Sequence, residues 1–136
     1  MPRRIQRKRV KGWRMPGGVI YVGRPTRYGN PYWHVEKFHG RGLSLALYEN
    51  TAQGIWNPAL LDGMPDPYVR QVYDTHREWT ARFSIHPLEE IEALLGGKDL
   101  ACWCREDAPC HADILIRLAN PANQPDLTPP NPGGRP

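Results

Sequence analysis

The stretch DLACWCREDAPCHADILIRLAN, residues 99–120, holds all three cysteines of the chain and predicts a strand, a turn and a helix. From Asp99 to Cys104 the residues are typical of a strand buried on both faces. Pro109 fits the first turn of a helix that continues to Asn120, because the first turn does not use the N–H that proline lacks. Strand, short turn and helix in this order indicate an α/β domain.

A second apolar run, from Val19 to Val22, precedes a loop of turn-forming and polar residues, GRPTRYGNPYW, at positions 23–33. Ligands of open α/β sheets bind at the carboxyl ends of buried strands. If the two strands are parallel neighbours, this loop and the turn from Arg105 to His111 converge at one edge of the sheet. The first turn of the following helix, with its free N–H groups and its dipole, then favours an anion and a thiolate at Cys110.

The rest of the chain supplies helices, long loops and two polar ends. A weak helical pattern covers residues 44–50, and an exposed loop is expected over 54–66. Stronger helical patterns cover 67–83 and 87–95, and His76 in the first of these is expected to be a core residue. Fifteen prolines and thirteen glycines indicate much irregular structure. We therefore predict a small Rossmann-like, three-layer α/β domain with a short, mostly parallel sheet over residues 17–120, a basic N-terminal arm over 1–16 and a Pro-rich flexible tail over 121–136.

Length and composition narrow the class of protein. With 136 residues, one domain with one site is expected. No apolar run reaches the roughly 20 residues that span a bilayer, and no signal-peptide pattern follows the basic start. We expect a cytoplasmic protein whose thiols are reduced or bind a metal, since an odd number of cysteines does not close a disulfide framework.

The basic arm suggests nucleic acid as one possible partner. The first fourteen residues hold seven of the eighteen Lys and Arg residues and no acid, so the remainder is mildly acidic. Such an arm attracts phosphates, and an aromatic ring within it can stack on a base, although a solvated arm that aids solubility has the same composition. The residues of this nucleic-acid hypothesis are Arg3, Arg4, Arg7, Lys8, Arg9, Lys11, Trp13 and Arg14.

The cysteine stretch allows three interpretations. Cys102, Cys104, Cys110 and His111 could form a Cys3His zinc site, although their spacing departs from the usual two-knuckle pattern. Cys110 could instead be a nucleophile. Its base would then be a residue such as His34 or His39, since Cys110 and its neighbour His111 point about 100° apart on a helix and cannot pair readily. In the third interpretation Cys102 and Cys104 are small buried hydrophobes. We predict no cofactor, and zinc is possible.

Three strings carry a resemblance to a known family: RIQRKRVKGWRMP (4–16), VIYVGRPTRYGNPY (19–32) and ACWCREDAPCHADIL (101–115). They resemble a family of uncharacterised domains, found mostly in bacteriophages and actinobacteria, with the signatures V-G-R-P-T-x-[WY]-G-N-P and C-W-C-x5-C-H. The third string is also similar to the start of the last helix in a second uncharacterised, Rossmann-like family. In that comparison Ala112 replaces an anion-binding arginine, so Arg24, Arg27 or Arg105 would have to supply the charge.

The resemblance implies a ligand site in two loops at strand ends, and Rossmann-like domains of this size resemble nucleotide-binding modules. We therefore expect a protein of phage type that binds a nucleotide or a nucleotide derivative, and an enzyme that acts on a nucleoside or nucleotide is one form that this function could take. Glu36, Asp107 and Asp113 are available as acids, but no spacing singles out a catalytic pair. The expected ligand-binding residues are Arg24, Thr26, Arg27, Asn30, Tyr32 (or Trp33 beside it), Arg105, Cys110 and His111.

Overall fold

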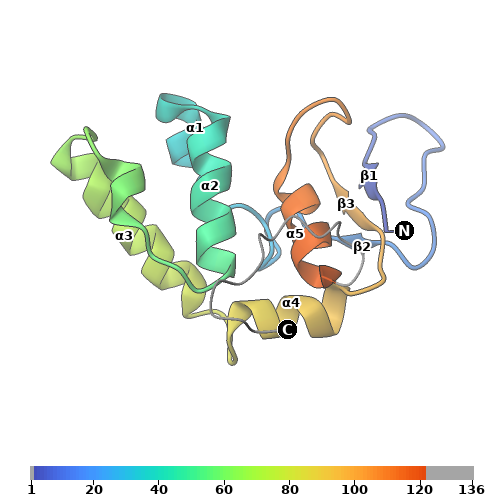
Figure 1. Ribbon diagram of the computed structural model, residues 1–136. Helices are drawn as coiled ribbons and strands as arrows, with labels where there is room; N and C mark the ends of the chain where they lie inside the picture. Colours follow the sequence, from blue (N-terminus) through green and yellow to red (C-terminus); the bar gives the residue numbers. More distant parts are fainter. Residues whose placement is uncertain (1, 122–136) are drawn as a thin grey trace, which may run out of the picture.

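A computed structural model describes residues 2–121, so all but the first residue of the predicted flexible tail (121–136) lies outside the described residues. The described elements are three short strands, five α-helices and one 3-10 helix (Figure 1). In chain order they are β1 Arg4–Gln6, β2 Ile20–Tyr21, α1 Trp33–His39, α2 Arg41–Ala52, η1 Pro58–Leu61, α3 Asp66–Thr80, α4 Pro87–Leu95, β3 Leu100–Cys102 and α5 His111–Ala119.

The three strands form one parallel sheet in the order β1-β3-β2. β3 lies in the centre, and all three of its residues are buried, as the continuous apolar run predicted. Residue 101 of β3 pairs with Ile5 on one side and with Tyr21 on the other. The predicted fold class, a small α/β domain with a short parallel sheet, is therefore confirmed.

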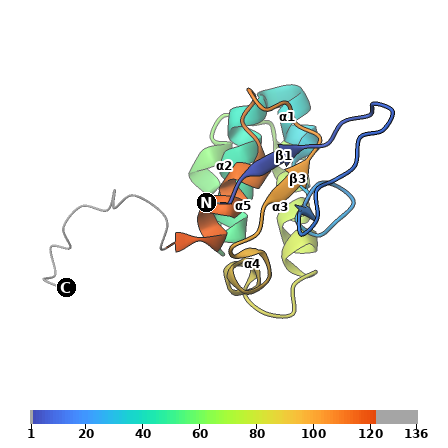
Figure 2. The same cartoon turned by 90° about the vertical axis from the view of Figure 1, so that its right-hand side faces the viewer.

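The helices gather on one side of this sheet, which corrects the predicted three-layer arrangement. In Figure 1 the strands lie to the right of α1, α2, α3 and α5, and in Figure 2 β1 and β3 lie in front of those helices. Within residues 2–121 no helix covers the opposite face. Ala101 on that face is nevertheless buried, and the Arg7 guanidinium lies 4.6 Å from the Tyr21 ring centre. Arginine and aromatic side chains thus cover a sheet that is too narrow to need a second helical layer.

β1 comes from the segment that the sequence suggested as a separate basic arm. Its neighbours extend the pairing with the central strand, because Leu100 N–H donates to the Arg3 carbonyl at 3.0 Å and Arg7 N–H donates to the Cys102 carbonyl at 2.8 Å. The Arg3 N–H also donates to the Asp99 carboxylate at 2.8 Å. Residues 3–7 therefore belong to the folded domain, and the boundary proposed at residue 16 does not separate an arm from it.

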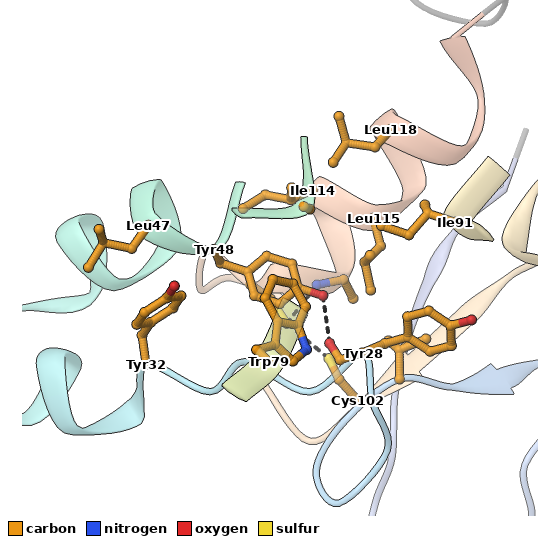
Figure 3. Close-up of a cluster of buried hydrophobic side chains, with 14 of the residues drawn as sticks. Tyr28, Tyr32, Leu47, Tyr48, Trp79, Ile91, Cys102, Ile114, Leu115 and Leu118 are labelled. Carbon is orange, nitrogen blue, oxygen red and sulfur yellow. Dashed lines mark hydrogen bonds between the residues drawn. The ribbon is translucent and has the colours of Figure 1, made fainter. Parts of the chain in front are cut away.

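A buried aromatic cluster joins the helices to the loop that follows β2 (Figure 3). The rings of Tyr48 on α2 and Trp79 on α3 lie 4.9 Å apart, and both side chains are almost fully buried. The Tyr48 hydroxyl donates to the Tyr28 carbonyl at 2.6 Å, and Trp79 Nε1 donates to the Arg27 carbonyl at 2.5 Å. These bonds satisfy the polar ends of the rings and hold the loop against the helices.

Two histidines of this helical layer make stability depend on pH. Burial lowers the pKa of both His34 and His76 below the ordinary value of 6.5. The unfolded chain then binds protons at a higher pH than the folded chain. Their contribution to stability is present above about pH 6.5 and is lost as the pH falls toward the lowered folded-state pKa. Urea unfolding between pH 7.5 and pH 5 should show this decline.

The matched variants are His76→Gln, which should flatten the decline, and His39→Gln at an exposed position, which should not. Unfolding free energies that stay constant across this pH range in the parent protein would contradict the assignment.

Candidate functional site

The predicted convergence of two loops is present at the carboxyl ends of β2 and β3. The two strands are parallel neighbours, so the loop after β2 and the turn after β3 leave the sheet at the same edge. His111, the first residue of α5, donates from Nε2 to the Val22 carbonyl at 2.8 Å, because a carbonyl can only accept. This bond ties the start of α5 to the end of β2.

The loop after β2 is compact and presents Arg24 outward. The Thr26 hydroxyl donates to the Gly23 carbonyl at 2.6 Å, and a Cβ on Gly29 would lie 2.8 Å from the Arg24 backbone nitrogen. Glycine is therefore required at position 29 of the GNP segment. Asn30 continues the turn, since its amide nitrogen donates to the Ser44 hydroxyl at 2.9 Å and its Oδ1 accepts from the Tyr32 N–H.

Three cavities open at this edge, and the two that share both Arg24 and Trp33 have volumes of about 180 Å³ and about 410 Å³. Arg24 and Trp33 line both and so mark their junction. The smaller cavity is also lined by Asn30, Glu36, Arg41, Leu45, Cys104, Pro109, Cys110 and His111. Residues from the two loops, from α1 and from α2 therefore form its wall.

The two arginines of the smaller cavity differ in their partners. Arg41 forms an ion pair with Glu36 at 2.9 Å and donates to the Pro109 carbonyl at 2.8 Å. Arg24 is exposed, has no ion-pair partner among residues 2–121, and holds its guanidinium 6.0 Å from the Trp33 ring centre. Of these two arginines, Arg24 is thus the one available to a ligand.

Cys110 is the N-cap of α5, where its sulfur accepts from the Ala112 N–H at 3.4 Å. Its Sγ lies 3.2 Å from Cys102 Sγ and 3.6 Å from His111 Nδ1. Hydrogen bonds from the Cys102 and Cys104 thiols hold the pKa of Cys110 well below its usual range. Hydrogen bonding to Cys104 and Cys110, together with burial, raises the pKa of Cys102. Of the three thiols, Cys110 is therefore the one whose surroundings favour the thiolate.

The three cysteines are also close enough to hold a metal ion. Their sulfur atoms lie within 4.8 Å of one another. The ring of His111, the fourth ligand in the Cys3His hypothesis, is not part of that cluster. Three of the four residues suggested by the sequence are thus brought together.

Five of the eight expected ligand-binding residues line the cavities. Arg24, Asn30, Cys110 and His111 lie at the smaller one, and Thr26 at the larger. The other three line neither cavity. Of these, Arg27 pairs with Glu90 at 2.8 Å, Tyr32 is buried with its hydroxyl 2.7 Å from Thr51 Oγ1, and Arg105 points outward and pairs with Asp107.

Sequence reasoning missed Arg41 and left Glu36 unassigned. Glu36 lies on α1 and Arg41 begins α2, in a segment without a motif. The two charges are five residues apart, which is not the spacing of a helix-surface pair, and they meet only because α2 follows α1 at an angle, so no local signal pointed to the site.

The residues of the nucleic-acid hypothesis do not form a free arm. Arg4 reaches the turn before α5, where it donates to the carbonyl of Ala108 at 2.9 Å. The guanidinium carbons of Arg7 and Arg9 each lie 4.5 Å from the Trp103 ring centre. Trp13 is half-buried, and Arg3, Lys8, Lys11 and Arg14 are exposed.

The fold and the site define a small α/β domain with a cationic, aromatic and thiol-lined cavity at the carboxyl ends of its parallel strands. Residues 5–121 match the model of the family described as Domain of unknown function (DUF4326), and the chain belongs to this family. Searches of curated proteins and of solved structures found no match. Within residues 2–121, none of the helices combines the length and the hydrophobicity that a membrane span requires.

Proposed function

We propose that the chain binds a nucleotide or a similar small molecule that carries an anionic group and a flat ring. The observation that carries this proposal is the pair Arg24 and Trp33 at the junction of the two cavities. Trp33 is 52% exposed, and Arg24 has no ion-pair partner among residues 2–121. An exposed indole offers a stacking surface to a base, and an unpaired guanidinium offers a fork to a phosphate.

The size and position of the cavities support the same proposal. The larger cavity, of about 410 Å³, lies within the range of about 300–1,000 Å³ that is usual for small-molecule sites. Both cavities lie at the carboxyl edge of a parallel sheet, which is where Rossmann-like domains hold their ligands. His34 lines the larger cavity, and its Nε2 is a buried atom without a hydrogen-bond partner among the described residues.

The sulfur of Cys110 changes where an anion would bind. The Cys110 sulfur already accepts the Ala112 N–H at the start of α5, and its surroundings favour the thiolate, so a phosphate would compete with it for that helix end. Arg24 therefore provides the main contact to the anion, with Arg41 as a weaker contributor because Glu36 neutralises it. Trp33 then contacts the base.

The test is calorimetric titration with the four ribonucleoside 5′-monophosphates. Arg24→Ala and Trp33→Ala should each weaken binding about tenfold or more, since a charge-assisted hydrogen bond and a stacked base each contribute about 1–3 kcal/mol. Arg105→Ala and Phe38→Ala are the matched controls, because both residues are exposed and neither lines a cavity at this edge of the sheet. Parent protein that binds none of these nucleotides, or Arg24→Ala that binds as the parent does, would refute the proposal.

The nucleic-acid hypothesis stays a prediction, and the salt dependence of binding distinguishes it from nucleotide binding in the cavities. Binding to the exposed basic residues of the N-terminal segment should weaken steeply as salt is raised, because phosphate neutralisation releases counterions. Binding of a mononucleotide in the cavities should depend on salt far less. A salt-sensitive affinity for DNA or RNA, without mononucleotide binding, would favour the nucleic-acid hypothesis.

A further inference from the structure

We propose that Cys102, Cys104 and Cys110 together hold one zinc ion through their sulfur atoms. Cys102 ends β3, Cys104 follows two residues later, and Cys110 caps α5 after the chain has turned back. The turn thus brings cysteines from both of its ends to one point, with all three sulfurs within 4.8 Å of one another.

The spacing of the sulfurs fits a zinc ion. Zinc binds thiolates at about 2.3 Å in tetrahedral geometry, which places the sulfurs about 3.8 Å apart. The Sγ atoms of Cys102 and Cys110 lie 3.2 Å apart, and no sulfur pair of the cluster exceeds 4.8 Å. Small rotations of the side chains would therefore bring the three sulfurs to a metal without movement of the backbone.

The surrounding charges suit a metal held by thiolates. Three thiolates and one divalent cation leave a net charge of −1, which a nearby cation must balance in a buried site. The Arg4 guanidinium, whose side chain is only 9% exposed, lies within hydrogen-bonding reach of Cys110. Arg41 also lies near Cys104 and Cys110, where its pairing with Glu36 leaves Arg4 as the main balancing cation.

Three protein ligands leave a fourth coordination position. Cys104 and Cys110 line the smaller cavity, so water or a donor atom of a bound molecule can reach the metal from that side. Zinc sites with three protein ligands and one open position are typical of zinc that binds or activates a small molecule. The metal proposal uses the sulfurs alone and holds whether or not the cavities bind a nucleotide.

The competing outcome is a bond between two of the cysteines. Cys102 and Cys110 are buried free thiols whose sulfurs are in contact, so an oxidant could join them in a disulfide. Oxidation removes two hydrogens from the chain mass, whereas bound zinc adds one metal mass in the native state only. Mass spectrometry therefore distinguishes these two chemistries directly.

The experiment is native mass spectrometry of the full chain, purified with a reductant and incubated with one equivalent of Zn²⁺, beside its denatured mass. We expect one zinc per parent chain and at least about a tenfold loss of zinc affinity in Cys104→Ser. Cys104 is the half-buried cysteine, so this variant should keep the fold, which far-UV circular dichroism checks. His39→Ala, which removes an exposed histidine outside the cluster, should keep the zinc.

Cobalt provides a second readout. Co²⁺ in place of zinc should give the parent protein a thiolate-to-cobalt charge-transfer band that weakens in Cys104→Ser and is unchanged in His39→Ala. A parent chain that takes up no metal, a denatured mass two hydrogens short despite the reductant, or a Cys104→Ser variant that binds zinc as tightly as the parent would each overturn the proposal.

Discussion

Replacing Trp79 with alanine is expected to lower the free energy of unfolding by about 3–5 kcal/mol. The side chain is 1% exposed and contacts the rings of Tyr48 and Phe83, at centroid distances of 4.9 and 5.7 Å. Its removal leaves a cavity and also leaves the Arg27 carbonyl without its donor. Because that carbonyl belongs to the loop that carries Arg24, ligand binding should weaken together with stability.

Urea unfolding followed by circular dichroism measures this effect. Trp33→Ala is the matched control, because the Trp33 side chain is 52% exposed and its loss should cost less than about 1 kcal/mol. A Trp79→Ala variant that loses less than about 1 kcal/mol would show that Trp79 does not hold α3 to the domain.

The elements with strong local patterns were predicted closely. The helix expected over 87–95 is α4, and the helix expected over 67–83 is α3, which the structure ends at Thr80. His76, expected in the core of α3, is half-buried and lies 3.1 Å from Thr51 Oγ1. In each helix a proline at an early position marks the start, and an apolar stripe marks the buried face. Such signals are local, so a sequence displays them before any tertiary contact is known.

β1 and α1 were missed because their signals are not local. β1 has only three residues, Arg4–Gln6, which lie inside a run of basic residues and gain their structure from a partner almost a hundred positions away. α1, Trp33–His39, begins without a side-chain cap, so nothing marks its start after the loop. Tertiary contacts decide both elements.

The candidate site was predicted in part for the same reason. The rule that parallel neighbouring strands end at one edge correctly placed the loop of Arg24 and Asn30 beside the start of α5. The rule does not say which way each side chain points. Arg27 and Tyr32 belong to the same loop, yet Arg27 pairs with Glu90 and Tyr32 fills the core.

Replacing Arg4 with methionine is expected to lower the free energy of unfolding by about 2–4 kcal/mol, since three carbonyls and one carboxylate would lose their donor. The guanidinium donates to the carbonyls of Arg105 at 3.0 Å, Glu106 at 2.7 Å and Ala108 at 2.9 Å, and lies 3.5 Å from the Asp113 carboxylate. Methionine keeps much of the apolar stem, so the loss reports these polar contacts rather than packing.

Arg3→Met is the control, because the Arg3 residue is exposed and only its backbone bonds to Asp99. It should change stability by less than about 0.5 kcal/mol. Equal effects of the two variants in urea unfolding would mean that Arg4 acts only as one more surface charge.

If Arg4→Met destabilises the protein and Arg3→Met does not, a truncation of residues 1–14 cannot test nucleic-acid binding, because the truncation removes both β1 and the side chain that holds the cysteine-bearing turn. Exchange of the exposed Lys8 and Lys11 for glutamine then becomes the proper test of that hypothesis.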